Sequence, residues 1–285
     1  MATILITGCG SGFGKLSAVE LARRGHRVFA SCRTLAAADQ LGAETAGRDG
    51  IVPLALDVTD QASVDAAMRR IGDAAGAIDV LVNNAGIARL GALEDLDADA
   101  LRGVMETNFF GALRVTRAVL AGMRTQGEGR IIMVSSLSAL VGLPGEGIYA
   151  ASKAALEAAA ESLRYEVDRF GIHVSVVEPG AFDTAMPAKL AAGDAVPAAS
   201  PYRPLLSYLT ARAQRQLGTG DDPQRVATLI ADIAETDEPG FRYAAGRQAE
   251  QVVQRLRALD ESARADFIRG VNDTQWWSAG ADRPE

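Results

Sequence analysis

The chain has 285 residues, of which 48% are hydrophobic and 23% are charged, and its formal net charge is −7. This balance is typical of a globular protein with one large α/β domain or two small ones, and the acidic charge argues against nucleic acid and anionic membrane as partners. No apolar run has the length of a membrane-spanning helix, residues 1–6 lack the basic segment of a signal peptide, and two cysteines are too few for a disulfide framework, so we expect a cytoplasmic protein with reduced thiols.

Short β-rich runs alternate with longer helical segments through the first 180 residues. Strands are predicted at 3–7, 27–31, 52–56, 80–82, 130–135 and 174–178, and helices between them at 13–24, 35–46, 61–74, 98–125 and 149–170. Such alternation produces βαβ units, and strands that are almost entirely apolar indicate a parallel sheet buried on both faces. No linker or repeat interrupts the pattern. We therefore predict a single Rossmann-like, doubly wound α/β domain over residues 1–285.

The chain after residue 184 differs in composition. Residues 185–220 are irregular and rich in Pro, Ala and Leu, and they are followed by a predicted helix at 223–234, a short strand at 241–244 and a helix at 248–269. We interpret 185–220 as a helical substrate-loop insertion that forms a lid, and 272–285 as a flexible tail that ends a C-terminal extension. The pair Trp276-Trp277 is either a partner-binding patch or, as is commoner, packs against the body or lies in a loose tail.

A glycine-rich turn, Thr7-Gly8-Cys9-Gly10-Ser11-Gly12-Phe13-Gly14, joins the first predicted strand to a helix. Backbone N–H groups and the helix dipole at such a junction attract phosphate, and glycine lets the ligand approach closely. The spacing is T-G-x-x-x-G-x-G. G-x-G-x-x-G fails at Phe13, and a Walker loop fails at Cys9 and Leu16, so ATP hydrolysis is not expected. A glycine cluster alone is also compatible with a flexible turn that binds nothing.

Further motifs follow the other predicted strands in order: Asp57-Val58, Asn83-Asn84-Ala85-Gly86, Ser136, Tyr149-Ala150-Ala151-Ser152-Lys153 and Pro179-Gly180-Ala181-Phe182-Asp183-Thr184. With them the chain resembles the short-chain dehydrogenase/reductase family, in its shorter single-domain form, from about residue 3 to residue 184. The segment 142–153 is most similar to the 17β-hydroxysteroid and retinol dehydrogenase branch. Many members have Asn where this chain has Met133 and Glu178, but neither position donates the reacting proton.

The resemblance implies a dinucleotide site built from Thr7, Gly8, Ser11, Gly12, Phe13, Gly14, Arg33, Asp57, Val58, Asn83, Asn84, Ala85, Gly86, Tyr149, Lys153, Pro179, Gly180, Phe182 and Thr184. We expect NADP(H) rather than NAD(H). In NAD-dependent relatives an acidic residue at the end of the second strand binds the adenosine ribose, and here Cys32 and Arg33 stand there. A guanidinium pairs well with the 2′-phosphate, although Arg33 as a solvated loop residue is the alternative.

The resemblance also implies that Asn108, Ser136, Tyr149 and Lys153 are catalytic. Tyr149 is the proton donor, Ser136 holds the substrate oxygen, and Asn108 anchors a water that leads to Lys153. Tyr149 and Lys153 share one helix face, and an ammonium about 4 Å away at an effective dielectric near 20 is worth about 4 kcal/mol, so we expect it to lower the tyrosine pKa by roughly three units. The alternatives are a surface Tyr149–Lys153 pair, Ser135 or Ser138 in place of Ser136, and a merely local hydrogen bond for Asn108. No cluster has zinc-ligand spacing, so no metal is expected.

The function we expect is hydride transfer between NADP(H) and a carbonyl or secondary alcohol of a bulky apolar substrate, which Ser136, Tyr149, Leu143 and Phe182 contact beneath the lid. Arg203 binding a small carboxylate is the alternative for the substrate. A non-catalytic NADP(H)-binding sensor or scaffold is the alternative for the protein, and an epimerase or dehydratase of the longer relatives is disfavoured by turn spacing and length. In the family, helices equivalent to 98–125 and 149–170 pack between subunits, so we expect a homodimer or homotetramer, unless these helices only cover their own sheet.

Overall fold

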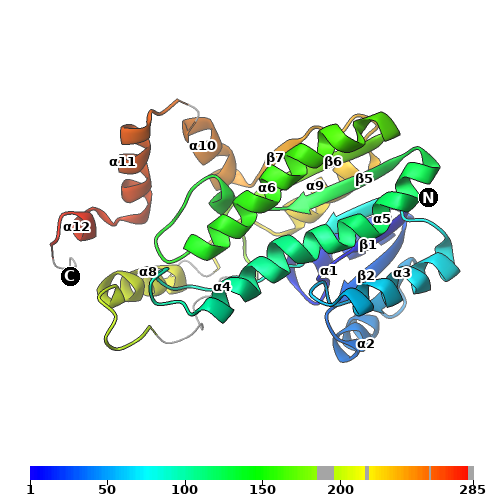
Figure 1. Ribbon diagram of the computed structural model, residues 1–285, viewed down its shortest axis with the longest axis horizontal. Helices are drawn as coiled ribbons and strands as arrows, with labels where there is room; N and C mark the ends of the chain where they lie inside the picture. Colours follow the sequence, from blue (N-terminus) through cyan, green and yellow to red (C-terminus); the bar gives the residue numbers. More distant parts are fainter. Residues whose placement is uncertain (185–195, 216–217, 257, 282–285) are drawn as a thin grey trace.

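Seven parallel strands form one sheet with helices on both faces (Figure 1). The computed structural model describes residues 1–184, 196–215, 218–256 and 258–281. The strands lie in the order β3-β2-β1-β4-β5-β6-β7. They are β1 Thr3–Ile6, β2 Arg27–Cys32, β3 Ile51–Ala55, β4 Val80–Asn83, β5 Gly129–Val134, β6 Ile172–Pro179 and β7 Arg242–Ala245. The predicted Rossmann-like, doubly wound fold is confirmed.

Two helical layers cover the sheet, because successive residues of a strand face opposite sides. Ile4 and Ile6 of β1 pack with one layer and Leu5 between them packs with the other. The first layer consists of α1 Gly12–Arg23, α2 Leu35–Glu44 and α9 Gln224–Glu235. The second consists of α3 Gln61–Ala75, α5 Ala112–Gln126 and α6 Gly147–Val167. Burial on both faces explains why the strands are apolar along their whole length.

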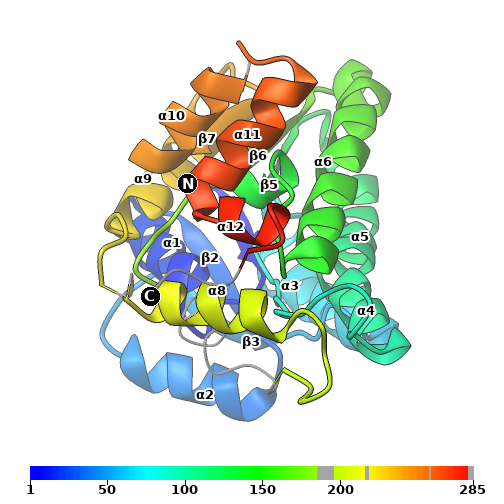
Figure 2. The ribbon, with the colours of Figure 1, turned by 90° about the vertical axis from the view of Figure 1, so that its left-hand side faces the viewer.

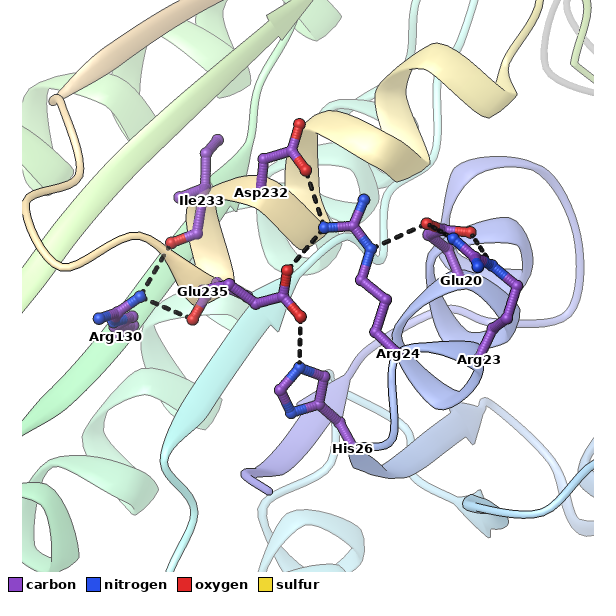
Figure 3. Close-up of polar contacts among 9 residues, drawn as sticks. Glu20, Arg23, Arg24, His26, Arg130, Asp232, Ile233 and Glu235 are labelled. Carbon is purple, nitrogen blue, oxygen red and sulfur yellow. Dashed lines mark hydrogen bonds and ion pairs between the residues drawn. The ribbon is translucent and has the colours of Figure 1, made fainter.

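A cluster of charged side chains fastens α9 to the turn between α1 and β2 (Figure 3). The Arg24 guanidinium lies 2.8 Å from a carboxylate oxygen of Asp232, 2.7 Å from one of Glu235 and 2.8 Å from one of Glu20. His26 Nε2 lies 2.9 Å from the other Glu235 oxygen. Residues about 200 positions apart in the chain are thereby joined on one face of the sheet.

The predicted helix over 98–125 divides into three continuous segments. These are α4 Ala98–Met105, a π-helix Glu106–Gly111 and α5. Asn108 lies in the π-helix and is 1% exposed. A π-turn inserts one extra residue and so redirects the side chains within it, which is why such turns are frequent at functional sites.

The C-terminal third places its helices across the carboxyl end of the sheet, where Figure 2 shows α8, α11 and α12 together. They are α8 Arg203–Arg215, α10 Arg247–Leu256, α11 Glu261–Asn272 and α12 Gln275–Ser278. The single helix predicted over 248–269 is therefore two helices. The second begins at Asp260, whose carboxylate accepts a hydrogen bond from the Ala263 N–H at 2.8 Å. None of the helices among the described residues combines the length and apolar character needed to cross a bilayer.

The described part of the predicted tail, residues 272–281, contains α12 and packs against the body of the protein. Trp276 in α12 is 8% exposed, and its ring packs edge-on against Tyr208 of α8 with the centroids 5.7 Å apart. A large aromatic ring with a buried partner stabilises order at a chain end. Residues 185–195 and 216–217 of the predicted lid and residues 282–285 of the predicted tail lie outside the described residues.

Candidate active site

A cavity of about 1460 Å³ opens at the carboxyl ends of the strands. The segments that follow five strands border it, through Gly12, Arg33, Gly86, Ser136 and Gly180. The order of the strands reverses between β1 and β4, and ligands of doubly wound sheets bind at this point. The cavity exceeds the roughly 300–1,000 Å³ of an ordinary ligand site, so it has room for a dinucleotide and a second molecule.

The glycine turn presents the N-terminus of α1 to this cavity. Ser11 caps the helix without a side-chain hydrogen bond, and the first turn of the helix has no acidic residue. The N–H groups of that turn therefore remain available to an anion such as a dinucleotide phosphate. Gly8 has a φ of +74°, and a Cβ there would lie 2.8 Å from the Ala85 Cα, so the turn requires glycine at this position.

The end of β2 provides a cationic border to the same cavity. Cys32 is 2% exposed, whereas Arg33 is exposed and borders the cavity together with Thr34 and Ala37. Arg33 has no ion-pair partner among the residues that the structure describes. Its guanidinium is thus available for a phosphate. Thr34 and Ala37 are neighbours of this site that the sequence motifs did not reveal.

Ser136, Tyr149 and Lys153 meet in the cavity. The Ser136 hydroxyl lies close enough to the Tyr149 phenol to lower its pKa, and Lys153 Nζ lies 5.9 Å from the centre of the tyrosine ring. Two neighbouring serines have other partners, because the Ser135 hydroxyl donates to buried Glu157 at 2.6 Å and the Ser138 hydroxyl donates to Glu146 at 3.0 Å. Ser136 is therefore the serine that contacts the tyrosine.

The protonation equilibria of Tyr149 and Lys153 are governed by burial. Burial raises the pKa of Tyr149 to about 12; the Ser136 hydrogen bond opposes this rise and the Glu146 charge adds to it. Burial lowers the pKa of Lys153 to about 8, and its ammonium donates to the Val134 carbonyl at 2.8 Å. The expected fall in the tyrosine pKa is therefore wrong for the protein alone. That expectation considered the distance between the charges and neglected desolvation.

Asn108 holds the loop after β4 in place beside Lys153. Its amide nitrogen donates to the Ile87 carbonyl at 2.8 Å and to the Ser152 hydroxyl at 2.9 Å, and its oxygen accepts from the Ile87 N–H at 2.8 Å. A Cβ on Gly86 would lie 3.4 Å from this oxygen and 3.5 Å from Lys153 Nζ. Asn108 thus lies near the lysine but does not border the cavity.

Several other predicted cofactor residues also lie behind the cavity wall. They are Thr7, Gly14, Asp57, Val58 and Asn83. The Thr7 hydroxyl accepts hydrogen bonds from the N–H groups of Asn84 and Ala85, both at 3.0 Å. The Asn83 amide donates to the Thr116 hydroxyl at 2.9 Å. In this structure Thr7 holds the loop after β4, and Asn83 joins β4 to α5, instead of lining the cavity.

Beyond Tyr149 the cavity is lined by both apolar and polar side chains, the polar ones including Arg212 of α8, Gln251 of α10 and Asn272 of α11. The predicted substrate residue Leu143 borders it, and so does Phe182, although Phe182 is only 4% exposed and packs edge-on against Phe13 with the ring centroids 5.4 Å apart. Further apolar walls come from the C-terminal helices, through Leu209 of α8, Val252 of α10, and Phe267, Ile268 and Val271 of α11. Arg203 is exposed and does not border the cavity. Of the proposed lid residues, Met186, Lys189 and Leu190 lie outside the described residues.

Known proteins share both the sequence and the fold of this chain. A family model described as short chain dehydrogenase matches residues 2–195. Retinol dehydrogenase 8 of Homo sapiens is 37% identical over 253 residues, which cover 84% of this chain and 80% of the relative. 17-beta-hydroxysteroid dehydrogenase type 1 of Homo sapiens is 33% identical over 282 residues, which cover 94% of this chain and 84% of the relative. The crystal structure of a gluconate 5-dehydrogenase from Burkholderia cenocepacia J2315, in complex with NADP and tartrate, matches with a TM-score of 0.73 and 26% identity, covering 88% of this chain and 95% of that one.

Proposed function

The chain belongs to the short-chain dehydrogenase family, in the branch of retinol dehydrogenase 8 and 17-beta-hydroxysteroid dehydrogenase type 1, and from this we propose that it reduces the carbonyl group of a bulky apolar substrate with NADPH. The observation that carries the proposal is the meeting of Ser136, Tyr149 and Lys153 in one cavity with the α1 N-terminus and Arg33. The apolar walls from α8, α10 and α11 favour a large hydrophobic ketone over a small keto acid.

The side chains provide what carbonyl reduction needs besides a hydride, which bound NADPH supplies. Ser136 holds the carbonyl oxygen, and Tyr149 donates a proton to it. Reduction needs a protonated phenol, and Tyr149 is protonated at neutral pH. Lys153 places a cation beside Tyr149, and Asn108 positions the lysine through the loop after β4.

The preference for NADP(H) rests on the end of β2. Arg33 faces the cavity where a carboxylate would bind the ribose hydroxyls of NAD, and a guanidinium is complementary to the additional phosphate of NADP. The related gluconate 5-dehydrogenase structure contains NADP, which supports the same choice. The residues we assign to the cofactor are those of the glycine turn, Arg33, the loop after β4, and Pro179 to Thr184 at the end of β6.

The activity test is NADPH oxidation with aliphatic, aromatic and steroid ketones, by wild type and by Tyr149→Phe. We expect Tyr149→Phe to lower kcat about 100-fold or more, because general acid catalysis typically contributes 10²–10⁴-fold, while the melting temperature stays nearly unchanged. Near wild-type turnover by Tyr149→Phe contradicts the mechanism. Tight NADPH binding without turnover of any ketone supports the sensor or scaffold instead.

We also propose a homodimer or homotetramer assembled through the helices of the second layer. The π-helix and α6 expose two large side chains there, Phe110 at 48% and Tyr165 at 67%. α5 and α6 run side by side on the outside of the sheet in both views (Figures 1 and 2). Burial of exposed aromatic side chains commonly stabilises an interface.

A further inference from the structure

Glu146 is the N-cap residue of α6, and its side chain lines the cavity. Its backbone carbonyl accepts the first helical hydrogen bond, from the Ala150 N–H at 2.8 Å. Its carboxylate makes no capping bond to the helix, and instead accepts a hydrogen bond from the Ser138 hydroxyl at 3.0 Å. Both side chains border the cavity. The carboxylate is therefore held toward the ligand space by a side chain outside the helix.

This carboxylate lies close to the reacting groups. Glu146 caps α6 three residues before Tyr149, and both side chains border the same cavity. The charge of Glu146 contributes to the raised pKa of Tyr149. Glu146 therefore borders the same cavity as Ser136 and Tyr149 and lies close enough to Tyr149 for its charge to act on the phenol.

The surroundings of Glu146 leave it with unused capacity to accept hydrogen bonds. The neighbouring cavity walls are apolar, formed by Leu90, Val141, Leu143 and Pro144. Within the described part of the chain, Glu146 has no cationic partner, and Ser138 is its hydrogen-bond donor. A carboxylate accepts up to about four hydrogen bonds, and leaving a largely buried one under-satisfied is costly. Burial accordingly raises the pKa of Glu146, against the effect of the Ser138 bond. A ligand with a hydrogen-bond donor near this carboxylate can therefore form a hydrogen bond that the protein itself does not provide.

We propose that Glu146 binds an amino or hydroxyl group that the substrate carries on a carbon next to the reacting carbon. The substrate class is then a long apolar ketone with a vicinal donor, and unsubstituted ketones of the same length bind less well. This inference rests on the proposed function for the position of the carbonyl group. Glu146 is a specificity residue here, and Ser138 fixes the orientation of its carboxylate.

The test compares three secondary alcohols of equal chain length in complex with the NADP⁺-loaded protein: one with a vicinal amino group, one with a vicinal hydroxyl group and one with neither. Dissociation constants are measured by calorimetry, and kcat/KM is measured for the three corresponding ketones. For wild type we expect about tenfold tighter binding of the donor-bearing compounds, the size of one hydrogen bond to a charged group. Glu146→Leu should remove both preferences. Glu146→Gln should remove the preference for the amino compound and keep part of the preference for the hydroxyl compound, which separates the two donors.

Glu166→Gln is the matched control, because Glu166 is an exposed carboxylate of the same helix outside the cavity. It should keep the wild-type ratios. Equal binding of the three alcohols by wild type, or the same ratios in Glu146→Leu, overturns the assignment of Glu146. If no ketone is reduced but the binding ratios depend on Glu146, the proposed function fails while the Glu146 site stands.

Discussion

At the scale of single residues, the proposed preference for NADP(H) depends on Arg33. We expect wild type to have at least tenfold higher kcat/KM for NADPH than for NADH. Arg33→Ala should lower kcat/KM for NADPH about tenfold or more and leave that for NADH little changed, because one charge-assisted hydrogen bond is worth about 1.5–3 kcal/mol. Arg48→Ala, which changes an exposed arginine away from the cavity, is the control. A wild-type preference for NADH, or unchanged NADPH kinetics in Arg33→Ala, contradicts the assignment.

The buried ammonium of Lys153 makes the stability of the protein depend on pH. Lys153 is 4% exposed, and burial lowers its pKa from 10.5 to about 8. Between these values the folded chain binds fewer protons than the unfolded chain, so stability rises with pH across this window. Relative to Lys153→Met, which lacks the titrating group, wild type should gain up to about 1.4 kcal/mol per pH unit. Urea unfolding of both proteins below pH 8 and near pH 10.5 measures the change. If the difference in unfolding free energy between wild type and Lys153→Met is the same at both pH values, the prediction is contradicted.

Residue spacing predicted which side chains meet, but not how they ionise. The four-residue spacing put Tyr149 and Lys153 on one helix face, and the family resemblance added Ser136; the structure brings all three to one cavity. Their pKa values follow from burial, which depends on the whole surrounding structure. Glu146 is absent from the motifs for a related reason. A glutamate before a helix indicates a solvated end, and only the Ser138 contact shows that it faces the cavity.

At the scale of helices and strands, the apolar periods predicted each central strand and helix to within a few residues. Two breaks within predicted helices were missed. The π-helix Glu106–Gly111 keeps the apolar pattern of the helices on either side, so one extra residue in a turn leaves no signal in composition. The end of α10 at Leu256 and the start of α11 after Asp260 lie within one amphipathic run, and only the Asp260 cap marks the boundary.

β7 is attached to α6 and β6 through Arg242, and removing this residue should destabilise the protein strongly. Its guanidinium pairs with Glu157 and lies 3.0 Å from an oxygen of Glu178 and 3.0 Å from one of Glu161. The first two carboxylates are 5% and 3% exposed, so Arg242→Ala leaves two buried charges unpaired and should cost about 3–5 kcal/mol in urea unfolding. Glu161→Gln removes the partner that is 50% exposed and should cost less than about 1 kcal/mol. Similar losses for the two variants contradict this account.

At the scale of the whole molecule, the alternation of strands and helices was sufficient to predict the sheet and the two helical layers that cover it. It was not sufficient to predict that α8, α10 and α11 together contribute apolar residues to the wall of the cavity. These helices border the same space as the turn after β1 and the end of β5, although the first of them, α8, begins 69 residues after β5 ends (203 − 134). Local patterns contain no information on such distant contacts.

The proposed assembly is also tested on the whole molecule. We expect light scattering at micromolar concentration to give the mass of a dimer or tetramer. Phe110→Glu and Tyr165→Glu should shift it toward the monomer, because each buries a charge in the proposed interface. Leu35→Glu, at a residue of α2 that is 63% exposed, should have no effect. A monomeric wild type would refute the assembly.

Arg242 lies in β7, the edge strand beside β6, and β7 is the last strand of the sheet to be synthesised. Glu157 and Glu178 are in place when about two thirds of the chain has been made, but their counter-charge arrives only with β7, the last strand. Until then, the exposed edge of β6 and two carboxylates without a cation make a compact, fully buried sheet unfavourable. The sheet therefore cannot be completed until residues 242–245 are available, and Arg242 then supplies the counter-charge for Glu157 and Glu178.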